Sequence, residues 1–120
     1  MHNRFSIIAL LLLISLSQNT LAEGILMKIQ PRDNEAITAF DGNVKLWFSG
    51  NVSERSPTLV VLDSQGNRVD NSDLKLTIAD RSELSATTRP LTAGQYVVRY
   101  RVVTDDGLIV SGISRFAVKP

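Results

Sequence analysis

The sequence predicts an all-β domain, a sandwich or barrel of short strands. Turn signals rich in Gly, Pro, Asn and Asp recur every eight to twelve residues between Pro31 and Gly107. The runs between them are short and rich in β-branched and aromatic residues, which is typical of strands that pack in two layers. The chain shows no long amphipathic helical pattern, no internal repeat and no linker. The fold is therefore expected to be a single β domain.

The first 22 residues are predicted to be a secretory signal peptide. Arg4 precedes an almost wholly apolar run, 6–17, and Thr20 and Ala22 stand at the small-residue positions of a cleavage site. The apolar run is shorter than the span of about 20 residues that crosses a bilayer. We expect cleavage after Ala22, which leaves a domain of 98 residues, 23–120, without a transmembrane segment.

Seven runs of the domain are predicted to be strands. They are residues 25–30, 44–49, 58–63, 74–79, 83–88, 95–104 and 108–119. In the second run, Val44, Leu46 and Phe48 alternate with Lys45 and Trp47, as expected for a strand buried on one face. The third run is more continuously apolar. In the fourth, the same alternation is expected to point Ile78 inward with two leucines, and the fifth run is a weaker strand.

The two longest runs, 95–104 and 108–119, flank the sequence Asp105-Asp106-Gly107. This segment is either an acidic site, a metal site or the bend of a hairpin. Asp-Gly favours a tight hairpin, because both residues tolerate the positive φ that such turns require. Adjacent carboxylates also point apart, which argues against a paired acid and base. Tyr96, after Leu91 and Gly94, indicates a tyrosine corner, in which the phenol bonds upstream backbone in Greek-key sandwiches.

Composition excludes several functions. From Glu23 onward, 12 Lys and Arg balance 12 Asp and Glu, so nothing suggests nucleic acid as a partner. The chain has no Cys, and its one His, His2, lies in the signal peptide. Catalytic triads and zinc sites of thiolate and imidazole cannot be assembled, and we expect no enzyme. Arg99, Arg101 and Arg115 are expected to share one sheet face, for which a solvated surface is favoured over an anion-binding stripe.

Several segments together resemble the CopC family of periplasmic copper-resistance proteins. They are Pro31, VKLWFSGNV (44–52), VLDSQGNRV (61–69), PLTAGQYVVRYRVVTDDG (90–107) and VSGISRFAV (110–118). The resemblance covers essentially all of the domain 23–120. It implies a seven-stranded Greek-key, immunoglobulin-like β-sandwich or barrel that is exported, soluble and, we expect, monomeric. It also implies a role in copper homeostasis, with a periplasmic or inner-membrane copper-handling protein as partner.

The resemblance implies a Cu(II) site, but this chain departs from it. The family's ligands are an N-terminal His and an Asp-x-His, and these positions fall on Glu23, Asp106 and Leu108. Both imidazoles are thus missing, and the segment 60–73 has no Met where the family has a methionine-rich loop. Glu23 and Asp106 remain as candidate copper ligands, and tight binding is not expected because Cu(II) prefers imidazole nitrogen. The alternative is a periplasmic protein-interaction module on the same fold.

Overall fold

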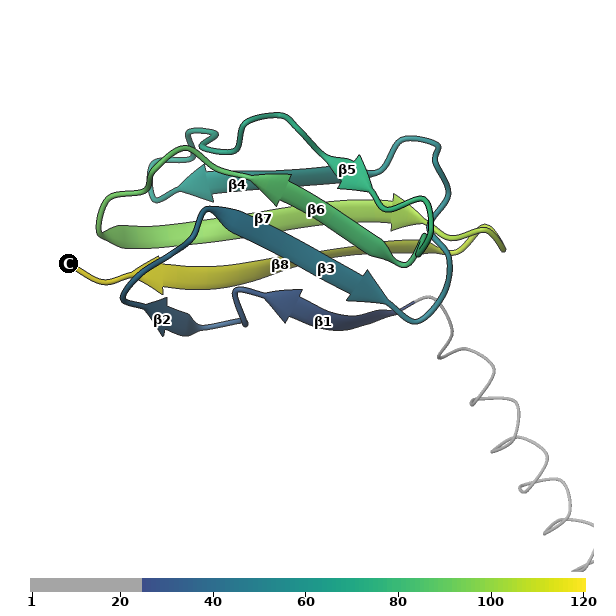
Figure 1. The fold of residues 1–120 in the computed structure, drawn as a ribbon, viewed down its shortest axis with the longest axis horizontal. Helices are drawn as coiled ribbons and strands as arrows, with labels where there is room; N and C mark the ends of the chain where they lie inside the picture. Colours follow the sequence, from purple (N-terminus) through teal and green to yellow (C-terminus); the bar gives the residue numbers. More distant parts are fainter. Residues whose placement is uncertain (1–24) are drawn as a thin grey trace, which may run out of the picture.

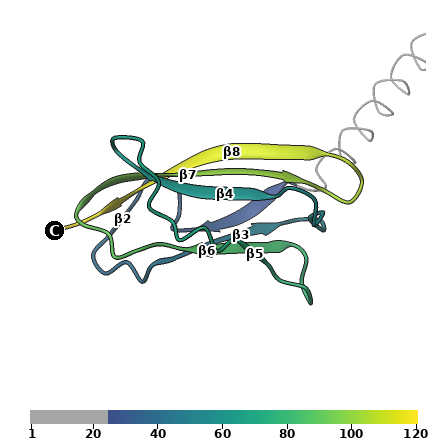
Figure 2. The same ribbon diagram turned by 90° about the horizontal axis from the view of Figure 1, so that it is seen from above.

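The structure is a computed structural model that describes residues 25–120. Eight strands form two layers (Figures 1 and 2). The strands are β1 (Leu26–Gln30), β2 (Glu35–Ile37), β3 (Asn43–Phe48), β4 (Thr58–Asp63), β5 (Lys75–Leu76), β6 (Glu83–Thr87), β7 (Gly94–Val103) and β8 (Ile109–Val118). The signal-peptide prediction and Glu23 fall outside the described residues.

One sheet has the order β1-β3-β6-β5 and the other β2-β8-β7-β4. Neighbouring strands are antiparallel, except that β2 runs parallel to the end of β8. The β7–β8 hairpin is the longest ladder, and its turn lies at the same end of the sandwich as the start of β1 (Figure 1). The predicted two-layer β-sandwich is therefore confirmed.

The core lies between the two sheets and is built by alternation. Val44, Leu46 and Phe48 of β3 are buried, as predicted, and Lys45 and Trp47 point to the other face. The remaining buried apolar residues are Val52, Leu59, Val61, Val69, Leu84, Ala86, Tyr96, Val98, Val102, Phe116 and Val118. Each fully buried Leu, Val or Phe contributes about 1.5–3 kcal/mol relative to an exposed position.

The tyrosine corner is present. The hydroxyl of Tyr96 donates a hydrogen bond of 2.6 Å to the carbonyl of Thr92, four residues upstream. The Tyr96 ring stacks on Phe116 with 5.5 Å between centroids. Tyr96 thus joins the loop before β7 to the core, and its predicted structural role is confirmed.

Each of the seven predicted runs contains a strand, but two details were wrong. The eighth strand, β2, escapes a pattern-based prediction because three residues are too few to show alternation. The predicted strand 74–79 shrinks to the two residues of β5, and Ile78, expected to point inward, is 87% exposed. The reason is a local turn: the Asp80 carboxylate accepts the Ser82 N–H at 3.1 Å, which bends the chain out of the sheet.

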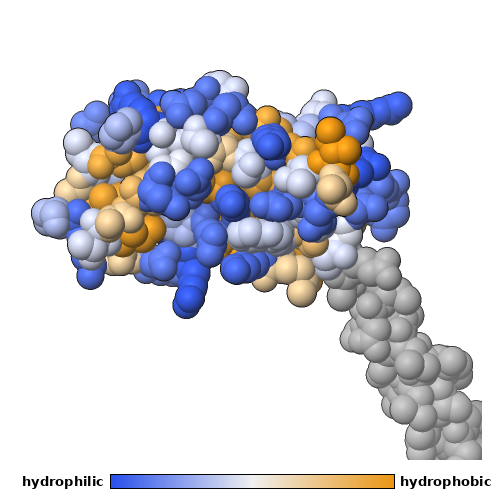
Figure 3. Space-filling view, in the orientation of Figure 1, coloured by the Kyte–Doolittle hydropathy of each residue, from blue (hydrophilic) through white to orange (hydrophobic). Residues whose placement is uncertain are grey.

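The face toward the reader in Figure 1, formed by the β1-β3-β6-β5 sheet, carries hydrophilic side chains between small apolar areas (Figure 3). Lys28 lies over the Trp47 ring on this sheet, 4.9 Å from its centroid. Within residues 25–120 there is no helix with the length and hydropathy needed to cross a membrane.

Candidate functional site

The acidic segment Asp105–Gly107 is the tight turn of the β7–β8 hairpin. Thr104 closes it: its N–H donates to the Leu108 carbonyl at 2.8 Å, and its carbonyl accepts the Gly107 N–H at 2.9 Å. Gly107 has φ of 87°, in the left-handed region that favours glycine. The interpretation of this segment as a bend is confirmed.

Asp106 lies exposed on this turn and is held by its own loop. Its carboxylate accepts a hydrogen bond from the hydroxyl of Thr104, which is itself buried. This bond, with backbone N–H groups of the turn, lowers the pKa of Asp106 despite a small opposing effect of desolvation. Asp106 is therefore an ionised carboxylate at neutral pH, with one oxygen engaged by Thr104.

Asp105 points to a different partner, Arg81, in the connection between β5 and β6. The two side chains form an ion pair of 3.1 Å, and the same guanidinium nitrogen donates to the Val52 carbonyl at 3.1 Å. The Val52 N–H returns a bond of 2.9 Å to the Arg81 carbonyl. Asp105 is thus paired with Arg81 within the domain, and the two aspartates do not form a carboxylate pair.

The start of the described chain lies at the same end. Ile25 and Ser49 exchange two hydrogen bonds, from Ile25 N–H to Ser49 Oγ at 3.1 Å and from Ser49 N–H to the Ile25 carbonyl at 2.9 Å. Two residues on, the Asn51 carbonyl accepts the Asp105 N–H at 3.1 Å. One short loop therefore holds both Ile25 and the hairpin turn. Glu23, two residues before Ile25, is outside the described residues.

The other positions considered for metal binding, Leu108 and Met27, do not add a group of ligands to the hairpin turn. Leu108 precedes β8 rather than belonging to it, is 41% exposed, and has no donor atom in its side chain. Met27 is exposed on β1, beside a shallow hollow lined by Lys28 and Arg32. Among residues 25–120 no group of three or more His, Cys, Asp or Glu is arranged to hold a metal ion.

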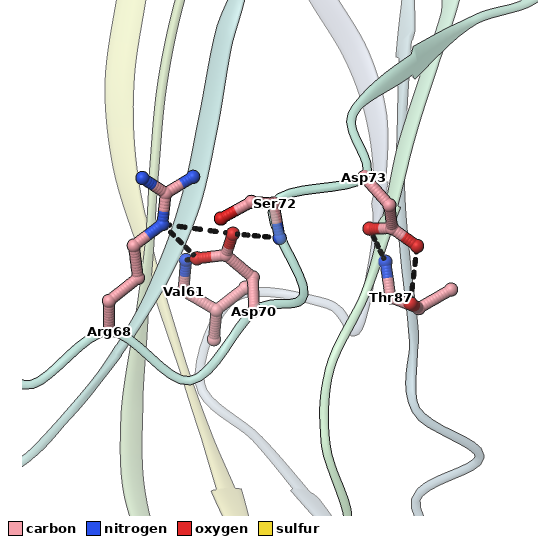
Figure 4. A network of polar contacts seen from close by, with 6 residues as sticks. All are labelled: Val61, Arg68, Asp70, Ser72, Asp73 and Thr87. Atoms are coloured by element: carbon pink, nitrogen blue, oxygen red, sulfur yellow. Dashed lines mark hydrogen bonds and ion pairs between the residues drawn. The ribbon is translucent and has the colours of Figure 1, made fainter.

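The loop 64–73, where the resemblance implied methionines, is fixed by aspartates instead (Figure 4). The Asp70 carboxylate, only 1% exposed, accepts the N–H of Val61 at 2.9 Å and of Ser72 at 3.1 Å. Arg68 Nε lies 2.9 and 3.0 Å from its two oxygens. Burial alone would raise the pKa of Asp70, but Arg68 and the two backbone donors together lower it.

Asp73 ties the same loop to the opposite sheet. Its carboxylate accepts the Thr87 N–H at 2.9 Å and also the Thr87 hydroxyl (Figure 4). These bonds, the hydroxyl bond above all, lower the pKa of Asp73. Since Val61 lies in β4 and Thr87 in β6, the two aspartates clamp the loop between the sheets. Their oxygens are engaged by protein donors, so the loop is a structural element.

Sequence reasoning missed Arg81 and the buried Asp70. Arg81 has no local signal, because its partner Asp105 is 24 residues away. The loop aspartates had a weak signal in the Asn-x-Asp and Asp-x-x-Asp spacings of residues 70–73, which are typical of turns and do not show which carboxylate becomes buried. Thr104 was also missed. A Thr directly before a turn often bonds the turn through its hydroxyl, but the prediction of this bend rested on the residues Asp105 to Gly107 alone.

Comparison with known proteins matches this geometry to one family. The CopC domain model matches residues 26–119. The crystal structure of CopC from Methylosinus trichosporium OB3b superposes with a TM-score of 0.75 at 33% identity, covering 82% of this chain and 95% of that chain. PcoC, a methionine-rich copper resistance protein from Escherichia coli, gives 0.65 at 25% identity, covering 82% and 100%.

A longer relative is the copper transport protein CutJ of Bacillus subtilis (strain 168). It is 26% identical over 118 residues, which cover 98% of this chain and 22% of CutJ. The chain therefore spans about a fifth of that relative. The family match extends over nearly all of the described residues, from the first strand to the last, and the fold, hairpin turn and tyrosine corner fall within it. The chain belongs to the CopC family.

Proposed function

We propose that the protein is an exported, periplasmic copper-handling protein whose copper site has lost its strongest ligands. The observation that carries this is the family match over residues 26–119, combined with Leu108 at the position where the resemblance implies a histidine. The relatives are a copper transport protein and copper resistance proteins, so the proposed role is binding or delivery rather than catalysis. An inner-membrane copper-handling protein is the proposed partner.

The remaining ligands are Glu23, with its amine and carboxylate, and Asp106. Carboxylate oxygen is a poorer donor for Cu(II) than imidazole nitrogen. The free amine, with a pKa of about 7.7–8.0, must lose a proton before it binds. Asp106 contributes an ionised carboxylate, but Asp105 beside it is paired with Arg81. These residues together support weak Cu(II) binding, comparable to a cluster of surface carboxylates.

The loop of residues 64–73 supports no separate Cu(I) site. Cu(I) favours thioether and thiolate ligands, and Met27 on β1 is the only methionine after the predicted cleavage site. The loop's carboxylates Asp70 and Asp73 accept hydrogen bonds from the protein itself. We therefore propose Cu(II), bound weakly, as the only copper species relevant to this chain.

The test is a competition titration of the mature protein against a chelator of known Cu(II) affinity. Glu23→His combined with Leu108→His is expected to raise the affinity at least about a hundredfold, since two imidazole nitrogens replace carboxylate and hydrocarbon. Leu108 is already 41% exposed, so its replacement costs little hydrophobic burial. The matched control combines Glu23→His with Ile109→His, one position farther along the hairpin and also exposed.

Two results would contradict the proposal. Tight binding by the wild type would show that the site is not depleted. No gain in the first double variant, or an equal gain in the control, would show that the family's ligand frame is not kept at Glu23 and Leu108.

The second candidate function, a periplasmic interaction module without metal, is favoured by the outer face of the β4-β7-β8 layer.

A further inference from the structure

The outward face of strands β4, β7 and β8 carries an unbalanced set of charges. We call it the arginine face and define it by Val60, Arg99, Arg101, Ile109, Ile113 and Arg115. Burial alternates along each strand, so these residues point away from the core, while Val61, Val98 and Phe116 point into it. Sequence reasoning favoured a solvated surface here, and the three arginines are exposed as that interpretation requires.

The three arginines are close neighbours. Arg99 and Arg101 stand two residues apart on β7, about 7 Å along the strand. Arg115 pairs with Val97 and Arg99 with Ile113, so Arg115 is a diagonal neighbour of Arg99, about 7–8 Å away. Like charges at these distances repel one another. No ion pair among the described residues offsets this repulsion, so the three guanidinium groups are available to a ligand outside the fold.

None of the three guanidinium groups has a hydrogen-bond or ion-pair partner within residues 25–120. Arg68 and Arg81 form ion pairs, with Asp70 and Asp105, whereas Arg32, Arg55 and Arg89 also have no ion pair among the described residues. Acids and bases balance over the mature chain. Asp33 lies at one end of the face, where its carboxylate accepts the backbone N–H of Arg115 at 2.9 Å, so the three guanidinium groups themselves remain without an acidic partner in the described part of the chain.

The neighbours of the arginines leave them accessible. Arg101 is flanked across the strands by Thr58 and Ser111, whose short side chains leave room beside the guanidinium. A shallow hollow of about 520 Å³ lies here, with Val60, Arg99, Arg101 and Ile113 among its walls. Ile113 is 54% and Ile109 57% exposed, so apolar contact area adjoins the charges.

The face ends on an open strand edge. β2 pairs only with Phe116–Val118, and the Asn34 N–H reaches the Arg115 carbonyl. Between Ile109 and Ser114, no strand of the described residues pairs with β8 on the side away from β7. Unpaired backbone groups of such an edge can accept an extended segment of another chain.

We propose that the arginine face and the adjoining edge of β8 bind an extended acidic segment of a partner protein. Planar guanidinium groups bind carboxylates through two parallel hydrogen bonds, which a lysine cannot reproduce. All three basic residues are Arg, although the mature chain also has four Lys on other elements and ends. Exposed isoleucines beside arginines match the composition of protein interfaces. Anionic lipid surfaces select clusters of about 4–8 basic residues, more than this face offers.

The test follows peptide binding by NMR on the mature protein with a metal chelator present, so that its outcome is independent of copper. The probe is a 15-residue peptide that alternates Glu and Val, and the control peptide has Gln in place of each Glu. Saturable shifts are expected at the arginine Nε–Hε groups of the face and at the backbone amides of 109–114. The Gln peptide is expected to bind at least about tenfold more weakly, because it lacks the charges that the guanidinium groups recognise.

The matched variants carry the same change of charge. The first triple variant combines Arg99→Glu, Arg101→Glu and Arg115→Glu and is expected to bind the Glu peptide at least about tenfold more weakly than wild type. The control triple variant combines Arg55→Glu, Lys45→Glu and Lys75→Glu. Its affinity is expected to change less than about threefold at 0.15 M salt, because charges more than about 8 Å apart are screened there. If the first triple variant does not fold, the three Arg→Gln substitutions take its place.

Three outcomes would overturn the proposal. They are no saturable shift at the arginine face with the Glu peptide, an equal loss of binding in both triple variants, and binding to vesicles of anionic phosphatidylglycerol without binding to the peptide. The last outcome would assign the face to a membrane surface instead.

Discussion

Asp70 is the residue whose removal is expected to test the structure most directly. Its buried carboxylate accepts hydrogen bonds from Val61, Ser72 and Arg68, and so joins the loop 64–73 to strand β4 (Figure 4). Asp70→Ala removes the acceptor for all three donors at once. The consequence differs among them, because only Val61 is fully buried.

The loss of stability can be estimated donor by donor. The Val61 N–H has no access to water, and an orphaned buried donor costs about 1–3 kcal/mol. The Ser72 N–H is exposed and the Arg68 side chain is half-exposed, so water replaces much of each bond, and together they cost about 1 kcal/mol. Asp70→Ala is therefore expected to cost about 2–4 kcal/mol, or roughly 8–32 °C in Tm for a domain of this size.

The assay is denaturant and thermal unfolding of wild type, Asp70→Ala, Asp70→Asn and Arg68→Ala. Asp70→Asn keeps an acceptor for Val61 and is expected to cost less than Asp70→Ala. Arg68→Ala removes only the exposed partner and is expected to cost about 0–1 kcal/mol. Two results would contradict this reasoning: a free energy of unfolding for Asp70→Ala within about 0.5 kcal/mol of the wild-type value, or a loss in Arg68→Ala as large as that in Asp70→Ala. Either would show that burial of the Val61 donor does not set the stability of this loop.

The same carboxylate gives a pH dependence of known direction. Folding lowers the pKa of Asp70, so its contribution to stability is complete above the unfolded value of about 3.9. That contribution is lost as the pH falls from about 4 through the lower folded pKa. The difference in unfolding free energy between wild type and Asp70→Asn is therefore expected to be constant from about pH 5 to 7 and to shrink below about pH 4. A difference that grows on acidification would contradict the lowered pKa.

Three further predictions concern the corner, the hairpin and export. Tyr96→Phe removes the bond to the Thr92 carbonyl and is expected to lower the free energy of unfolding by about 0.5–1.5 kcal/mol; an unchanged denaturant midpoint would exclude the corner bond. Gly112→Ala would bring a Cβ into the hydroxyl end of the Tyr100 ring and is expected to cost about 1–3 kcal/mol, but almost nothing in a Tyr100→Val background; equal costs in both backgrounds would show that Tyr100 does not fill this space. The intact mass of the exported protein is expected to equal that of a chain beginning at Glu23, and a mass that includes residues 6–17 would refute cleavage after Ala22.

Most of the fold was predictable from strong periodic patterns in the sequence. The alternation in β3 and the length of β7 and β8 placed the core, because inward residues such as Leu46 and Val98 repeat with the period of a strand. The tyrosine corner and the Asp-Gly turn were readable because each depends on residues close in sequence. Strand β2 and the exposed Ile78 were not, because three residues show no period and a local turn overrides the pattern beyond Leu76.

The candidate site was only partly readable for a related reason. The Asp-Gly signal predicted the turn in which Asp106 lies, and the family resemblance made Asp106 a candidate ligand. Arg81, by contrast, reaches Asp105 across 24 residues and leaves no local pattern in the sequence. The partners of Asp70 also converge only after folding, since Val61 lies in a strand and Ser72 in a loop. Sequence patterns thus identify residues that a turn or strand positions locally, and miss charges that meet through tertiary contact.

The contact between Arg81 and Asp105 explains how this end of the sandwich is held together without a metal. The guanidinium joins the hairpin turn to the Val52 carbonyl, and Asn51 and Ser49 bind Asp105 and Ile25 on the same loop. These bonds are made by protein groups alone, so the fold itself holds Asp106 and Leu108 at this turn. Leu108 is 41% exposed, so a change of side chain there is expected to cost little structurally. By this reasoning the family's copper ligands are separable from its fold, and restoring two histidines tests that separation directly.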